Sequence, residues 1–285
     1  MKNTISSSLK SLIKDFVPPI FLKFLGKQLK KSKCYDSYDE AMKDADGYED
    51  KDLIRVVVAK GKKFAEKISE TKELDLTSLR TFIGLASLLG KKKLTVIDFG
   101  GAAGAHFFVA KSILSKDLVI DWRVVETTKM VNEAKKQGLE SKELSFFNSL
   151  EAATSNVEID LVFASGSIHY TPKPYEFMKS LVSINAKNLM ITRTPITDYP
   201  TVLLQHSSLI SNGVGEIPDE IEIANKVISY PVTIMDRDKV EKLLSSFGSI
   251  ILKISEDKGV YSSRMKSYNM YGYIVSKEAK HVISG

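Results

Sequence analysis

The sequence is poor in residues that form covalent cross-links and metal centres. It contains one cysteine, Cys34, and four histidines among 285 residues. A lone cysteine forms no internal disulfide and no clustered thiolate site, which excludes disulfide-stabilised scaffolds and favours a reducing compartment such as the cytoplasm. The histidines are scattered and have no carboxylate at ligand spacing, so no bound metal is expected.

Long apolar runs and strong charge are also missing. The longest apolar run near the start, Phe16 to Leu22, is far too short to span a bilayer, and no small-residue cleavage site follows it. The formal net charge of +6 favours anionic partners without choosing among them. Because no nucleic-acid-binding module is recognisable, nucleic acid is not an expected partner.

Residues 1–50 are expected to form a basic helical extension followed by a linker. Apolar residues recur at near-helical spacing over 5–33, with lysines around them and a break at Pro18-Pro19. Two hypotheses fit this pattern: an element that lies on an anionic membrane surface, or a helical hairpin packed on the following domain. The acidic, polar stretch from Tyr35 to Asp50 reads as the linker, which places a catalytic domain at 51–285.

The rest of the chain predicts an α/β fold of the Rossmann-like type. Helical spacing over 53–68 and 78–89 is followed from Leu94 by strand-like runs that alternate with amphipathic segments. Strands are expected at 94–99, 119–126, 144–147, 159–165, 188–193, 250–254 and 271–275, and helices at 104–114, 127–137, 174–185 and 237–247. These elements make a seven-stranded, mostly parallel sheet with an antiparallel closing strand. The stretch 196–233 shows no clear strand and is expected to be an acceptor lid.

A glycine-rich turn joins the first strand of this sheet to its helix. Gly100, Gly101 and Gly104 let the backbone turn tightly and approach a ligand closely. The dinucleotide pattern G-x-G-x-x-G fits in no register, which disfavours a pyrophosphate. Asp98 would repel a phosphate but could receive a cationic amino group, such as that of S-adenosylmethionine.

Three further residues are expected beside this cofactor. Glu126, 22 positions after Gly104, ends the second strand where a carboxylate can accept hydrogen bonds from both ribose hydroxyls. It is equally compatible with an acid at the start of the next helix. Asn148, just past the third strand, is expected at the adenine edge, although an Asn in a turn needs no ligand. Ser165, which ends the fourth strand, completes the expected cofactor site.

These residues resemble those of the class I S-adenosylmethionine-dependent methyltransferases. The signature D-x-G-G-x-x-G is matched by Asp98 to Gly104, and the acid of the second strand by Glu126. A narrower resemblance, from near Tyr35 to the C-terminus, is to a group of bacterial methyltransferases associated with surface-polysaccharide synthesis. This resemblance rests on the short motifs Tyr38-Asp-Glu-Ala41, Gly47-Tyr48, Gly104-Ala-His106, Ala164-Ser-Gly-Ser167, Tyr170, Arg193-Thr-Pro195, Gln205 and Tyr230-Pro231. The resemblance implies the fold and the cofactor, and leaves the acceptor open.

The candidates for catalysis lie near the carboxyl ends of the expected strands. His169 is the first candidate for a general base, with bracing of its loop as the alternative, and Tyr170 is a candidate to position the substrate. His106, which opens the helix after the glycine turn, is a second candidate base. Arg193 could pair with a phosphate or carboxylate of the acceptor, or hold the insertion through a salt bridge. His206, in the insertion, could line the acceptor pocket.

Taken together, the sequence predicts an enzyme that O-methylates a sugar or a lipid-linked saccharide with S-adenosylmethionine. Two alternatives stay open: a catalytically inactive cofactor-binding module that acts in an assembly, and a nucleotide-dependent oxidoreductase. The expected partner is a small-molecule or glycan acceptor. The expected location is the cytoplasm, peripheral to the inner membrane if residues 5–33 contact it.

Overall fold

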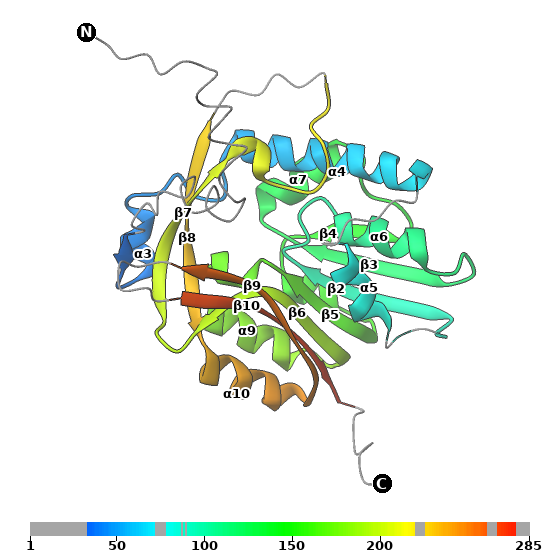
Figure 1. The fold of residues 1–285 in the computed structure, drawn as a ribbon. Helices are drawn as coiled ribbons and strands as arrows, with labels where there is room; N and C mark the ends of the chain where they lie inside the picture. Colours follow the sequence, from blue (N-terminus) through cyan, green and yellow to red (C-terminus); the bar gives the residue numbers. More distant parts are fainter. Residues whose placement is uncertain are drawn as a thin grey trace, which may run out of the picture.

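The computed structural model describes residues 33–71, 78–86, 88, 90–219, 226–260 and 267–277. The stretch 5–33, expected to be helical, lies almost entirely outside this part of the chain. Ten described strands form one mixed sheet, flanked on both faces by helices (Figure 1).

Seven strands make up a mostly parallel sheet in the order β4-β3-β2-β5-β6-β10-β9. Their bounds are β2 Lys93–Phe99, β3 Val119–Val125, β4 Leu144–Phe147, β5 Ile159–Ser165, β6 Ala186–Thr197, β9 Ser249–Val260 and β10 Ser267–Ser276. β10 runs antiparallel to both of its neighbours, β6 and β9. The predicted antiparallel closing strand is therefore present.

The helices cover the two faces of the sheet as two separate apolar cores. One face carries α4 (Lys51–Thr71), α5 (Leu79–Ala86), α6 (Ala105–Ile113) and α7 (Thr128–Lys136). The other carries α8 (Leu150–Thr154), α9 (Pro174–Ser183) and α10 (Arg237–Phe247). Local signals set their starts: the Asp236 carboxylate accepts a hydrogen bond from Lys239 N at 2.9 Å at the start of α10. Pro174 occupies the first turn of α9.

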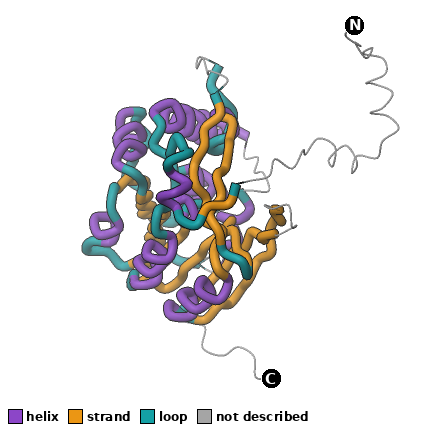
Figure 2. The backbone as a smooth tube through the Cα atoms, turned by 90° about the vertical axis from the view of Figure 1, so that its left-hand side faces the viewer, coloured by secondary structure: helices purple, strands orange, loops and turns teal. Residues whose placement is uncertain are grey.

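The expectation of seven strands, with none in 196–233, is wrong. β7 (Thr201–Ser208) pairs antiparallel along its whole length with β8 (Val227–Asp236), and a short β1 (Cys34–Tyr35) pairs with β7. Figure 2 looks onto this hairpin, whose strands are orange. The prolines and glycines of the segment predict turns, yet Pro231 fits here because β8 meets β6 only at Met235 and Asp236, which leaves β8 an edge at Pro231.

Residues 34–50 also belong to the folded unit and do not form a linker. Besides β1, they contain helix α3 (Tyr38–Met42), and the Asp46 carboxylate accepts hydrogen bonds from Ser229 N at 2.8 Å and Ser229 Oγ at 2.6 Å. The contacts that hold this segment are distant in sequence, so its acidic composition could not reveal them. None of the described helices has the length and hydropathy needed to cross a bilayer.

Candidate cofactor and acceptor site

The glycine turn between β2 and α6 winds tightly against two neighbouring strand ends. Gly100, Ala102 and Gly104 have left-handed backbone, with φ of 68°, 50° and 78°. Gly100 N donates to Val125 O at 2.9 Å, and a Cβ on Gly100 would lie 2.2 Å from Ser167 Cβ. Close packing on Ser167 therefore leaves no room for a side chain at Gly100, and the turn lies at the carboxyl edge of the sheet, where ligands of open α/β sheets bind.

Asp98 differs from its expected role. Its side chain is fully buried and accepts a hydrogen bond from Trp122 Nε1 at 3.0 Å, while His106 Nδ1 lies 3.0 Å from the same oxygen. A buried indole N–H needs an acceptor, and Asp98 supplies it from the neighbouring strand. The carboxylate thus supports the turn from inside the protein and is not placed to meet a cofactor amino group directly.

His106 takes part in the same contact with Asp98. Its Nδ1 faces Asp98, and its ring packs edge-on against Phe163 at 4.8 Å between centroids. Its expected role as a base is therefore weaker than its role in bracing the turn.

Glu126 stands where the sequence predicts it, at the carboxyl end of β3. Its Oε1 accepts from Ala102 N at 3.1 Å and its Oε2 from Thr127 N at 2.9 Å. Burial raises the pKa of Glu126, against the lowering effect of these two hydrogen bonds. The two bonds fix the carboxylate and leave each oxygen a second lone pair, as two ribose hydroxyls would require.

Three tyrosines, Tyr48, Tyr170 and Tyr230, line the same edge of the sheet and form a tyrosine wall. The Tyr170 ring stacks on Tyr48 at 5.8 Å, and Tyr230 packs edge-on against both at 5.3 Å. Burial raises the pKa of Tyr48; the nearby Glu126 charge raises it further and the Arg193 charge opposes it. Tyr48 therefore lies between the cofactor end and the Arg193 end of the site.

A hydrogen-bonded chain ties this wall to the β7–β8 hairpin. Tyr170 Oη donates to Gln205 Oε1 at 3.2 Å, Gln205 Nε2 donates to Tyr230 Oη at 3.3 Å, and Tyr230 Oη donates to Asn212 Oδ1 at 3.1 Å. Sequence reasoning gave no role to Tyr48, Tyr230 or Asn212. The only signal was that Gly47-Tyr48 and Tyr230-Pro231 occur among the short motifs on which the family resemblance rests.

His169 is enclosed behind Tyr170, with ring centroids 4.2 Å apart. Only 2% of His169 is exposed, and its Nδ1 has no hydrogen-bond partner among the described residues. Burial and the Arg193 charge lower the pKa of His169 to about 3. The imidazole is therefore neutral at physiological pH and binds a proton only weakly.

The other predicted residues divide between the site and its surroundings. Ser165 is buried at the end of β5 and accepts a hydrogen bond from Thr192 Oγ1 at 2.9 Å. Asn148 is exposed just past β4. His206 is exposed and does not join the tyrosine wall, because strand residues alternate in direction and its neighbour Gln205 is the one that faces the wall.

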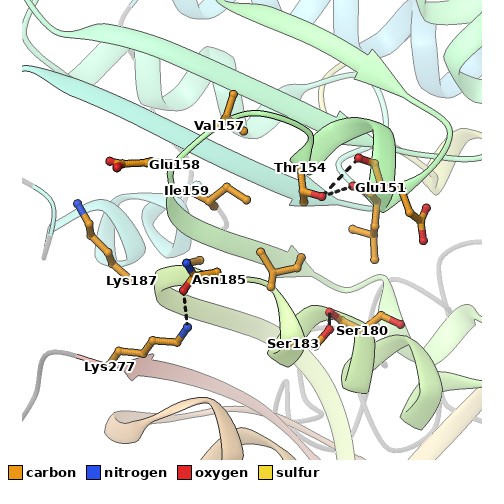
Figure 3. Close-up of a pocket in the computed structure, with 13 residues that line it drawn as sticks. Glu151, Thr154, Val157, Glu158, Ile159, Ser180, Ser183, Asn185, Lys187 and Lys277 are labelled. Atoms are coloured by element: carbon orange, nitrogen blue, oxygen red, sulfur yellow. Dashed lines mark hydrogen bonds between the residues drawn. The ribbon is translucent and has the colours of Figure 1, made fainter.

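A cavity of about 810 Å³ lies elsewhere, at the amino ends of β5 and β6 (Figure 3). Lys187, Lys277, Glu151 and Glu158 are among its lining residues, and Lys277 Nζ donates to Asn185 Oδ1 at 3.3 Å. It opens at the sheet edge opposite the glycine turn. It is therefore separate from the candidate site.

Comparison with known proteins gives distant structural likeness only. The sequence matches no protein-family model, and no curated protein matches it. Among solved structures it is similar to the N-terminal domain of EvdMO1 with SAH bound, at 12% identity over 72% of this chain and 82% of that one, with a TM-score of 0.44. An S-adenosylmethionine-dependent methyltransferase from Clostridium acetobutylicum has 13% identity over 75% and 98% of the two chains, with a TM-score of 0.42. Magnesium protoporphyrin IX methyltransferase from Synechocystis, with bound SAM, has 13% identity over 79% and 97%, with a TM-score of 0.39.

Proposed function

We propose that this chain is an S-adenosylmethionine-dependent methyltransferase. The observation that carries the proposal is the pairing of the left-handed turn Gly100–Gly104 with a Glu126 carboxylate fixed by two backbone N–H groups. A nucleoside with free ribose hydroxyls fits this pair, because the carboxylate accepts where the hydroxyls donate. A dinucleotide fits less well, since the turn lacks the G-x-G-x-x-G spacing that lets the backbone approach a pyrophosphate.

The residues present can hold the nucleoside half of such a cofactor. Glu126 would take the ribose, and the backbone of the glycine turn would lie against the rest of the nucleoside. When bound, S-adenosylmethionine supplies an electrophilic methyl group whose transfer to an acceptor atom leaves the neutral thioether S-adenosylhomocysteine. The remaining task of the protein is to align the acceptor lone pair and exclude water, for which the tyrosine wall is suited.

We propose a sugar or lipid-linked saccharide hydroxyl as the acceptor, supported by the sequence resemblance. A hydroxyl must lose its proton as it is methylated. His169 is neutral and its Nδ1 is unpaired, so it can accept a hydrogen bond, although a pKa of about 3 makes it a weak base. Replacement His169→Ala is expected to lower turnover while leaving cofactor affinity nearly intact.

Calorimetry tests the cofactor. S-adenosylhomocysteine is expected to bind and NADH to give no heat, and Glu126→Gln should weaken S-adenosylhomocysteine at least tenfold. Heat from NADH alone would overturn the proposal in favour of an oxidoreductase. Binding of S-adenosylhomocysteine without methylation of any glycan acceptor would favour the cofactor-binding module, for which the weak basicity of His169 is the supporting observation.

A further inference from the structure

The backbone at Arg193 is built in an unusual way. Ile191 lies opposite Tyr273 and Thr194 opposite Tyr271, so Thr192 and Arg193 together face Gly272 in a β-bulge. Arg193 has a left-handed φ of 54°, a conformation that is unfavourable for a non-glycine residue. Its N–H donates to Glu256 Oε1 at 2.8 Å, and Glu256 Oε2 accepts from Arg80 Nε at 2.5 Å. Such conformations persist where surrounding contacts hold them, often at binding sites.

The bulge directs the Arg193 side chain over the carboxyl edge of the sheet. A Cβ on Gly166 would lie 3.1, 3.3 and 3.4 Å from Arg193 Cζ, Nε and Nη1. Because these three distances are nearly equal, the guanidinium plane lies across the bare backbone at Gly166. Gly166 follows directly after β5, so the cation lies beside the end of β5, at the start of the turn that contains Ser167.

This cation has no counter-ion in the described part of the chain. Arg193 is half-buried, and its guanidinium donates no hydrogen bond to any described side chain or carbonyl. The Arg193 charge acts on the tyrosine wall and His169: the pKa of His169 falls because of burial and then of this charge, and the same charge opposes the burial-driven rise of the pKa at Tyr170 and Tyr230. Half-burying a charge without a partner is costly, and binding an anion would offset this cost.

A second polar group without a partner among the described residues belongs to the segment that follows Gly166. His169 Nδ1 is buried and lacks a partner among the described residues, and its ring lies against Tyr170. The guanidinium plane offers donors in a fork that matches the two oxygens of a carboxylate or a phosphate. A neutral imidazole beside it can accept or donate one more hydrogen bond.

We propose that Arg193 binds an anionic group of the methyl acceptor, a carboxylate or a phosphate, and that the acceptor is therefore an acidic or phosphorylated saccharide. The inference rests on the proposed methyltransferase function. It assigns Arg193 to the acceptor because Arg193 lies in β6, which β5 and β2 separate from Glu126 at the end of β3. The competing occupant is the carboxylate of the cofactor itself.

Three matched sugars test the proposal: glucose, glucuronate and glucose 1-phosphate. Each is titrated into the full chain with and without S-adenosylhomocysteine, and binding is followed by ligand-observed NMR. At least one anionic sugar is expected to bind tenfold or more tightly than glucose, and which of the two does so distinguishes carboxylate from phosphate. Arg193→Met should abolish this preference, and Arg193→Lys should retain part of it. Lys187→Met, which removes one charge at the opposite edge, is the control and should keep the whole preference.

Two results would overturn the inference: equal binding of neutral and anionic sugars, or an anion preference that survives Arg193→Met. If the second result comes with a loss of S-adenosylhomocysteine affinity in Arg193→Met, Arg193 belongs to the cofactor. If wild-type protein does not bind S-adenosylhomocysteine, the proposed methyltransferase function fails by itself. The titrations without S-adenosylhomocysteine still report on Arg193 in that case.

Discussion

At the scale of single residues, two carboxylates at neighbouring strand ends differ in whether they can bind a ligand. Asp98 is sealed inside by Trp122 and His106, whereas Glu126 is fixed by backbone N–H groups with lone pairs left over. Only their surroundings distinguish them. The sequence therefore located Glu126 correctly at the end of its strand but could not show that Trp122, on the adjacent strand, takes the Asp98 carboxylate.

The raised pKa of Glu126 predicts how cofactor affinity depends on pH. Burial moves this pKa above the ordinary value of 4.5, so protonation begins at a higher pH than in a free glutamate. A protonated carboxyl loses acceptor capacity toward the ribose hydroxyls. As the pH is lowered, affinity for S-adenosylhomocysteine should therefore begin to fall before the pH reaches the ordinary glutamate value of 4.5, whereas in Glu126→Gln it should be weak and independent of pH. Calorimetry at several pH values measures both, and equal slopes in the two proteins would contradict the assignment.

His169 predicts the pH dependence of stability. Its folded pKa is about 3, below the ordinary 6.5, so the unfolded chain takes up the proton first as the pH falls. The contribution of the neutral His169 to the unfolding free energy is fully present above about pH 6.5. It is lost as the pH falls toward 3, at up to ~1.4 kcal/mol per pH unit. Urea titrations at pH 7.5 and 5.5 should show a smaller decrease for His169→Phe than for wild type. The exposed His206→Phe is the control and should keep the wild-type slope; a wild-type slope in His169→Phe would show that His169 is not neutral and enclosed.

At the scale of secondary structure, the predictions succeeded where the pattern was local. Strands such as β2 and β5 and the helix α10 follow from apolar runs and a capping aspartate, and they occur within a few residues of the expected bounds. The β7–β8 hairpin was missed because Pro231 and the neighbouring glycines signal turns. The roles of Tyr48 and of the Arg193 side chain depend on contacts with distant segments, which no local pattern reveals.

The packing of α4 on the glycine turn gives a prediction about a helix. A Cβ on Gly61 would lie 2.4 Å from Ala103 Cβ, in the turn, whereas a Cβ on Gly84 of α5 would meet the Met190 sulfur at 2.2 Å. Alanine favours a helix by about 1 kcal/mol over glycine, but overpacking a core costs about 1–3 kcal/mol. Methionine can rotate away and the Ala103 Cβ, fixed to the backbone, cannot.

Gly61→Ala is therefore expected to destabilise the protein by about 1 kcal/mol and to weaken S-adenosylhomocysteine binding, because α4 or the turn must move. Gly84→Ala is the matched change and should have a smaller effect on stability and none on affinity. Urea denaturation and calorimetry on both variants make the comparison. Equal losses in the two would show that α4 does not position the turn.

At the scale of the whole molecule, the positive charge is concentrated at one end of the sequence. Residues 1–32 contain seven of the 41 basic residues and one of the 35 acidic residues. The remainder thus has 34 residues of each sign, and the net charge of +6 belongs entirely to the N-terminal stretch. A neutral domain preceded by a basic, apolar segment is the charge pattern of a protein that contacts anionic lipid, at about 1 kcal/mol for each lysine near the surface.

The membrane hypothesis for residues 5–33 is tested by flotation with vesicles. Because residues 34–50 pack on β7 and β8, the shortened chain must begin at Lys33, so that Tyr48 and the site stay intact. The full chain should float with vesicles that contain phosphatidylserine and float less with neutral vesicles. Its binding should weaken as the salt concentration rises from 0.1 to 0.5 M, because the electrostatic screening length then falls from about 10 to about 4 Å. The shortened chain should stay at the bottom of the gradient yet bind S-adenosylhomocysteine as before. If both chains float alike, the extension packs on the domain and lipid contact lies elsewhere; if neither floats, its lysines serve another anionic partner.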